Sequence, residues 1–148
     1  IADILAENEI PVVLNSLHNL PDHRSDEIDQ IYRLPKILSD AGILFAISIS
    51  GSWEIRNLPF VAGSAVAYGL EYEKAIASVT SAPAEIIGAG ALGTIEVGKK
   101  ATLIVSSGDL LDMKESKIQH AFIDGNPVDL SNRHLSLYKE FNAKYSDN

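Results

Sequence analysis

The chain has 148 residues, and 46% of them are hydrophobic, which is typical of a folded domain and excludes a disordered chain. Its formal net charge of -8 argues against nucleic acid as a partner, because an acidic protein repels phosphates. The absence of cysteine excludes disulfides, thiolate metal sites and a cysteine nucleophile, and no apolar run approaches the ~20 residues that span a bilayer.

The chain begins with a helical pattern and then a strand pattern. Ile1, Ile4 and Leu5 have helical spacing, which predicts the tail of a helix that ends at Asn8. Residues 10–16 (IPVVLNS) are short and rich in β-branched side chains, so they are predicted to form a buried strand. Because the chain starts in a helix without an initiator Met or a leader-like segment, we expect it to be a piece of a longer protein. Its compartment is not encoded, with the cytoplasm slightly favoured.

A second strand comes after a loop and a helix. Residues 18–29 are polar and contain a proline, which is typical of a long loop. Residues 32–42 predict a short helix, with Pro35 in its first turn and Gly42 at its C-terminal exit. Residues 43–50 (ILFAISIS) predict another apolar strand. Two apolar strands joined through a helix indicate a parallel βα unit buried on both faces.

The middle of the chain is predicted to be helical. Residues 51–57 read as a loop, 58–70 as a helix rich in small residues, and 71–81 as an amphipathic helix. Pro83 and the glycines between 88 and 93 are expected to end this helical region.

From Gly93 the pattern changes to short strands, at residues 94–97, 101–107 and 117–130, with a hairpin turn at Asp124-Gly125. A final helix is expected over residues 131–145. Either Ser131 or Asn132 can cap its N-terminus. The chain therefore divides into an α/β region up to about residue 90 and a small β region with a helical tail.

An ordered series of residues spans the change from helices to strands. It consists of Thr80, Pro83, Ala84 and Gly88, then GTIEVGK at 93–99 and ATLIV at 101–105. This series resembles the end of the amidohydrolase superfamily, in particular its imidazolonepropionase-like members. The segment RNLPFVAGSAVAYGL also resembles the region after the eighth barrel strand in that family. The resemblance implies an α/β fold, the C-terminal part of a (β/α)₈ barrel plus part of a small β-sandwich. It assigns residues 1–90 to the last β/α units, 91–130 to sandwich strands and 131–148 to a helical tail.

The resemblance also implies hydrolysis of C–N bonds in linear or cyclic amides, by water activated on a divalent metal such as zinc or iron. Most metal ligands of the family would precede Ile1. One ligand, an Asp at the end of the eighth strand, should fall within this chain, where the sequence reads FAISISGSWE at 45–54. Ser50, or Ser52 if the loop shifts, stands at that position, and neither is a carboxylate. Glu54 is the nearest acid. We expect no metal site in this chain, since a neutral hydroxyl is a weak ligand and a poor base.

Several other residues are candidates for substrate contact. His18 comes after the first strand and either projects into the barrel mouth or is an ordinary loop histidine. Trp53 and Arg56 come after the second strand; Arg56 either pairs with a substrate carboxylate or anchors its loop. No G-x-S-x-G elbow supports a serine nucleophile, and no HxH or HExxH motif supports a metal site. The remaining histidines are expected to be structural or on the surface: His23, His120 and His134.

Two functions remain open from the sequence. One is the C-terminal portion of an amidohydrolase-like enzyme acting on a small amide, inactive by itself. The other is a non-catalytic barrel-derived protein that binds a small molecule or another subunit. Two barrel strands cannot close a cylinder, so we expect either self-association or a missing N-terminal portion as the partner.

Overall fold

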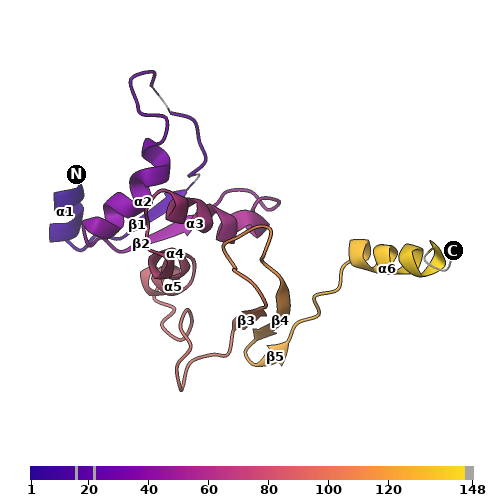
Figure 1. The fold of residues 1–148 in the computed structure, drawn as a ribbon. Helices are drawn as coiled ribbons and strands as arrows, with labels where there is room; N and C mark the ends of the chain where they lie inside the picture. Colours follow the sequence, from indigo (N-terminus) through magenta and orange to yellow (C-terminus); the bar gives the residue numbers. More distant parts are fainter. Residues whose placement is uncertain (16, 22, 146–148) are drawn as a thin grey trace.

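A computed structural model describes residues 1–15, 17–21 and 23–145 (Figure 1). Ser16, the last residue of the first predicted strand, and Asp22, in the predicted loop, lie outside the described residues. The helices are α1 (Ala2–Glu7), α2 (Gln30–Asp40), α3 (Leu58–Ala67), α4 (Tyr72–Val79), α5 (Ser81–Ile86) and α6 (Arg133–Tyr145), with a 3₁₀ turn at Ile55–Asn57. The strands are β1 (Val12–Asn15), β2 (Phe45–Ser48), β3 (Leu103–Ser106), β4 (Ile118–Ile123) and β5 (Asn126–Pro127). None of the described helices combines the length and apolar character required to cross a membrane.

Strands β1 and β2 form a parallel pair joined through α2, as the two apolar runs predicted. Their register runs from Val12 opposite Phe45 to Asn15 opposite Ser48. Phe45, Ala46 and Ile47 are all buried, because helices α2 to α5 all contact β2. The main core lies around this strand and includes Leu14, Leu38, Ile43, Val61 and Leu70. Residue pattern and packing therefore agree that β2 is a buried strand of an α/β layer.

The end of α2 directs the chain into β2. Gly42 has φ +70°, and its N–H donates to the Ser39 carbonyl at 3.0 Å. The Ile43 N–H donates to the Leu38 carbonyl at 3.0 Å, which completes a Schellman motif. The predicted role of Gly42 as the helix exit is confirmed, because an L-residue with a side chain rarely adopts this φ.

Two predictions about prolines are wrong. Pro35 is not in the first turn of α2, since the helix starts at Gln30 and Pro35 lies in its interior. It is nearly fully buried there, so packing offsets the lost backbone hydrogen bond. Pro83 does not end the helical region; it is the third residue of α5, where a missing N–H costs little. The helical region extends to Ile86 before Gly88 turns the chain.

The β region is an antiparallel meander in the order β3–β4–β5. Its second turn is the predicted Asp124-Gly125 hairpin, with φ of 50° and 79°. The strand predicted at 94–97 does not form. Ile95 and Val97 are almost completely exposed, and the segment runs as irregular chain with no partner strand among the described residues.

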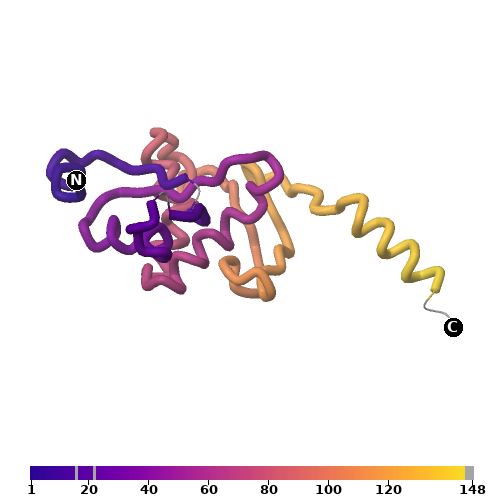
Figure 2. The backbone as a smooth tube through the Cα atoms, turned by 90° about the horizontal axis from the view of Figure 1, so that it is seen from above, coloured from indigo at the N-terminus to yellow at the C-terminus, as the bar shows by residue number. Residues whose placement is uncertain are grey.

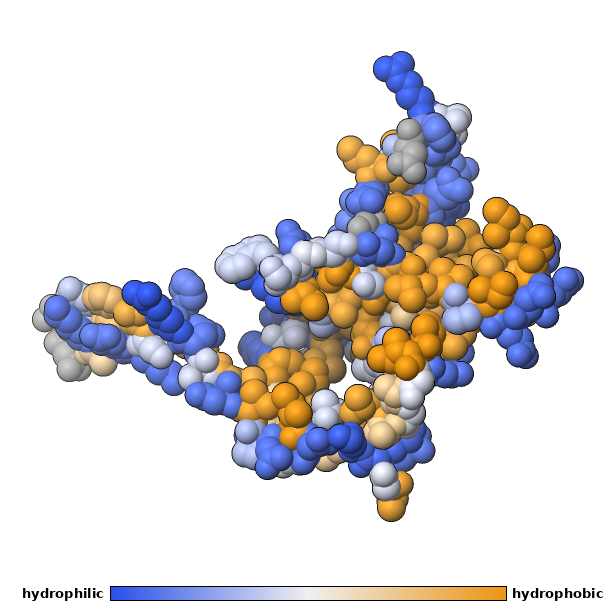
Figure 3. Space-filling view, turned by 180° about the vertical axis from the view of Figure 1, so that it is seen from behind, coloured by the Kyte–Doolittle hydropathy of each residue, from blue (hydrophilic) through white to orange (hydrophobic). Residues whose placement is uncertain are grey.

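Helix α6 extends away from the rest of the molecule (Figures 1 and 2). The side chain of Asn132 caps it, since its Oδ1 accepts the Leu135 N–H at 3.0 Å, which resolves the two predicted alternatives. All its residues are exposed. Seen from behind, the α/β part presents a broad hydrophobic surface (Figure 3). Apolar residues left exposed in this part include Ile4, Ile10, Val13, Ile55 and Ile87.

Candidate functional site

The carboxyl ends of β1 and β2 lie at the same edge, because the two strands are parallel. In α/β folds this edge is where ligands bind. Asn15 ends β1, and its Nδ2 donates to the Ser50 Oγ at 2.7 Å. The bond ties the last residue of β1 to the loop after β2. It leaves the Asn15 Oδ1 as an acceptor and the Ser50 hydroxyl hydrogen as a donor.

His18 lies three residues beyond Asn15 and is held by two helices. Its Nε2 is 3.1 Å from the Ser64 Oγ on α3. Its ring lies against Tyr32 on α2, with the centroids 5.6 Å apart, and Tyr32 stacks on Tyr68 at 5.0 Å. The His18 side chain is exposed, but these contacts give it a defined position beside α2 and α3.

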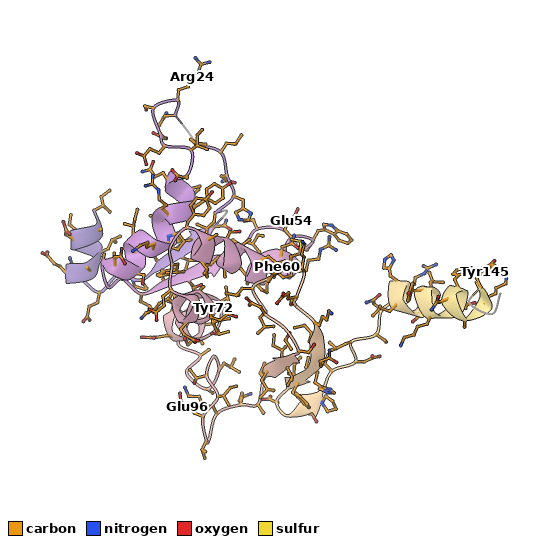
Figure 4. All side chains as sticks on the ribbon, in the orientation of Figure 1. Arg24, Glu54, Phe60, Tyr72, Glu96 and Tyr145 are labelled. Atoms are coloured by element: carbon orange, nitrogen blue, oxygen red, sulfur yellow. The ribbon has the colours of Figure 1, made fainter. Side chains whose placement is uncertain are left out.

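The loop after β2 contains the other predicted residues. Ser52 lies exposed in the turn, and Trp53 is 71% exposed. The Arg56 guanidinium lies 4.5 Å above the Trp53 ring, so these two residues contact each other in a cation–π pair. The Glu54 carboxylate folds back over Gly51, where a Cβ would lie 2.2 Å from Oε2. Figure 4 labels Glu54 in this loop and Phe60 in the first turn of α3.

The structure brings some predicted residues together and separates others. Ser50 is hydrogen-bonded to Asn15 at the end of β1, whereas Ser52 lies further along in the turn. Asn15 and Ser64 were not among the predicted site residues. A signal for Asn15 was present, since it is a polar residue at the end of an apolar strand. The signal for Ser64 is tertiary, because its partner His18 is 46 residues away.

The other three histidines lie elsewhere. The backbone N–H of His23 donates to the Asp26 carboxylate in the long loop. His120 is on β4 with its ring 6.4 Å from that of Phe122, and His134 is exposed on α6. All three side chains are exposed.

The strand edge does not fit a metal centre in this part of the protein. Among residues 1–15, 17–21 and 23–145, no three His, Asp or Glu side chains are grouped so that they could hold a metal ion. The Ser50 oxygen, at the position of the expected carboxylate ligand, is neutral and already accepts a hydrogen bond from Asn15. The edge instead offers uncharged donors and acceptors.

The largest pKa shift lies away from this edge. The Tyr72 hydroxyl on α4 donates to the Asp109 Oδ1 at 2.7 Å. This hydrogen bond, with smaller effects of burial and nearby charge, raises the pKa of Tyr72 to about 12. The same bond, helped by the Leu111 N–H, lowers the pKa of Asp109. The hydrogen bond connects α4 to the loop between β3 and β4, so the two pKa shifts are explained by a structural contact.

Comparisons with known proteins agree on one family. The family model described as "Amidohydrolase family" matches residues 2–128. The amidohydrolase tasK of Hapsidospora irregularis is 34% identical over an alignment of 112 residues, and the match covers 71% of this chain and 11% of that protein. A solved amidohydrolase from Thermotoga maritima MSB8 superposes with a TM-score of 0.74 at 30% identity, covering 86% of this chain and 33% of that one.

A second solved amidohydrolase, 21% identical, has a TM-score of 0.60 and supports the fold alone. It covers 88% of this chain and 37% of that one, so the chain spans about a third of the solved relatives it matches.

Proposed function

Because the chain belongs to the amidohydrolase family, we propose that it is the C-terminal portion of a hydrolase acting on non-peptide C–N bonds, in cyclic or linear amides. The parallel β1–β2 pair represents the last two strands of a (β/α)₈ barrel. The β3–β5 sheet represents part of a β-sandwich beside it. The fragment by itself is inactive, since most of the reacting groups lie in the remaining portion.

The observation that supports this proposal most strongly is the strand edge itself. Asn15, His18 and Ser50 come from two parallel neighbouring strands or the segments just after them, at the carboxyl end where barrel enzymes bind substrates. The Ser50 hydroxyl can donate to a substrate carbonyl, and the Asn15 Oδ1 can accept from a substrate N–H. An amide group presents this combination of acceptor and donor.

Any zinc or iron of the complete enzyme would be held by side chains outside this chain. The neutral Asn15–Ser50 pair binds and orients the amide in place of a metal-bound carboxylate. Trp53 and Arg56 form an exposed pair beside this edge and are proposed to contact the part of the substrate that does not react.

The N-terminal portion of the same protein is the proposed partner of the open surfaces. An apolar groove of about 630 Å³ lies between α4, residues 92–95 and the β3–β4 sheet. Ile76, Leu103, Ile104, Phe122 and Val128 are among the residues that line it. Burying such side chains gives roughly 25 cal/mol per Å² of apolar area, so a covering strand would be strongly held. Self-association is the alternative way to cover it.

One observation favours a second candidate function. Since Ser50 provides no carboxylate, the complete protein would lack one of the metal ligands expected from the family resemblance. A non-catalytic barrel that binds a small amide or another subunit is therefore the alternative.

Assays of the complete protein distinguish the two candidates. We expect turnover on a panel of N-acyl and cyclic amides, together with bound divalent metal by elemental analysis. Ser50→Ala should lower kcat/KM about tenfold, because one hydrogen bond to the bound amide is lost. Ser52→Ala, two residues further along the same loop, should stay within about twofold. Zero turnover with no bound metal would leave only the binding function.

A further inference from the structure

The hydroxyl of Ser64 is shared between two hydrogen bonds. Its Oγ donates to the Phe60 carbonyl one turn earlier in α3, at 3.1 Å. The same Oγ lies 3.1 Å from the His18 Nε2. A serine hydroxyl carries a single hydrogen and has two acceptor lone pairs. When that hydrogen is directed to Phe60, Ser64 accepts from His18 and the His18 Nε2 carries a hydrogen.

This arrangement determines the tautomer of a neutral His18. With the hydrogen on Nε2, the lone pair is on Nδ1. No described residue makes a hydrogen bond to that nitrogen. A half-turn of the ring would put a carbon in place of Nε2 and break the hydrogen bond to Ser64. Packing against Tyr32, which in turn stacks on Tyr68, restrains the plane of the ring. The contacts with Ser64 and Tyr32 therefore orient the imidazole ring.

We propose that Ser64 is a positioning residue that holds His18 in the Nε2–H tautomer, so that Nδ1 accepts a hydrogen bond from a ligand N–H at the edge of the sheet. The choice of an amide N–H as the ligand group rests on the proposed function. The tautomer itself does not, because it is inferred from the contacts of Ser64 with Phe60 and His18 within the chain.

Nitrogen NMR of the complete protein, labelled with ¹⁵N-histidine, tests the tautomer without any substrate. His18→Gln identifies the His18 signals. At a pH where the ring is neutral, the Nε2–H form should exceed the Nδ1–H form by at least about tenfold, which is the effect of one hydrogen bond. Ser64→Ala should reduce this ratio several-fold, and Ser64→Thr, which keeps the hydroxyl, should restore it. A dominant Nδ1–H form, or a ratio unchanged in Ser64→Ala, would overturn the proposal.

A pair of small probes tests the acceptor role of Nδ1. 2-Pyrrolidinone carries an amide N–H, whereas N-methyl-2-pyrrolidinone has the same ring without it. At high concentration the first should shift the Nδ1 resonance and the second should not. Equal shifts from both probes, or none from either, would exclude Nδ1 as the acceptor. If the tautomer is as expected and the enzyme still lacks amide turnover, the hydrolase function fails and the positioning role of Ser64 stands.

Discussion

Tyr72 is the residue whose titration is most clearly affected by the fold. Its hydroxyl bonds to the Asp109 carboxylate, and the bond favours the neutral phenol and the ionised carboxylate together. The folded pKa of Tyr72 lies above the ordinary value of 10, so its contribution to stability is present below pH 10 and lost as the pH rises toward about 12. The folded pKa of Asp109 is lowered, so its contribution is lost as the pH falls below the ordinary 3.8.

We therefore expect Tyr72→Phe to lower the thermal midpoint at neutral pH, because the donor to Asp109 is removed. The difference from wild type should shrink in strongly acidic solution and again above pH 10. Tyr138→Phe, on the exposed helix α6, is the matched control and should change little. Thermal unfolding by circular dichroism across this pH range measures both. A difference that stays constant from acid to alkali would show that the hydrogen bond does not explain the effect.

At the residue scale, the sequence shows which side chains follow a strand but not which of them meet in space. Ser50 was chosen as the last residue of the predicted strand; in the structure it follows the end of β2 at Ser48 and is hydrogen-bonded to Asn15. Asn15 carried the same signal but was not predicted, since an amide side chain is neither a usual metal ligand nor a general base. Ser64 could not be found from its position, because it faces His18 only after α3 packs beside the strand end.

At the scale of elements, Gly63 lets another segment approach α3. A Cβ at this position would lie 2.3 Å from the Leu111 carbonyl oxygen. Leu111 is buried and belongs to the loop between β3 and β4, so Gly63 is a contact between the helical region and the β region. The loop backbone sits where a side chain would otherwise lie.

Gly63→Ala should thus destabilise the protein, although alanine normally favours a helix interior by about 1 kcal/mol. Overpacking against backbone costs about 1–3 kcal/mol, which exceeds that gain. Gly90→Ala is the control, because its Cβ would meet nothing within 4 Å and should be nearly neutral. Denaturant titration gives the free energy of unfolding for each. Equal stability of the two variants would mean that the loop near Leu111 moves aside without cost.

Elements with their own local signal were predicted well. The apolar runs of β1 and β2, the Gly42 exit and the Asp124-Gly125 hairpin are all determined within a few residues. Residues 94–97 have a strand composition but no partner strand, so pairing rather than propensity decides their conformation. Pro83 was misjudged because a proline is compatible with the first turn of a helix as well as with its end.

At the scale of the whole molecule, the β1–β2 sheet, which contains the buried strand β2, has unpaired edges. β1 and β2 pair only with each other among the described residues, so each has one open edge of backbone groups. Val13 on β1 is 56% exposed, and Ile10 just before it is 45% exposed. Open edges with apolar side chains favour pairing with another chain.

An isolated chain of residues 1–148 is accordingly expected to self-associate at micromolar concentration, with a mass by light scattering above that of a monomer. Val13→Lys should reduce the association, since a charge on an open strand opposes pairing. Leu20→Lys, at an exposed position in the long loop, should leave it unchanged. A well-folded monomer that binds little hydrophobic dye would contradict this expectation.

The detached helix α6 has a practical consequence. Since no side chain between Arg133 and Tyr145 is buried, chemistry performed there hardly disturbs the packed interior. Tyr145, at the far end of the helix in Figure 4, is the natural attachment point for a fluorophore or an immobilisation handle. A fluorophore placed there would tumble almost independently of the rest of the molecule. Its fluorescence anisotropy would rise when a partner binds the helix.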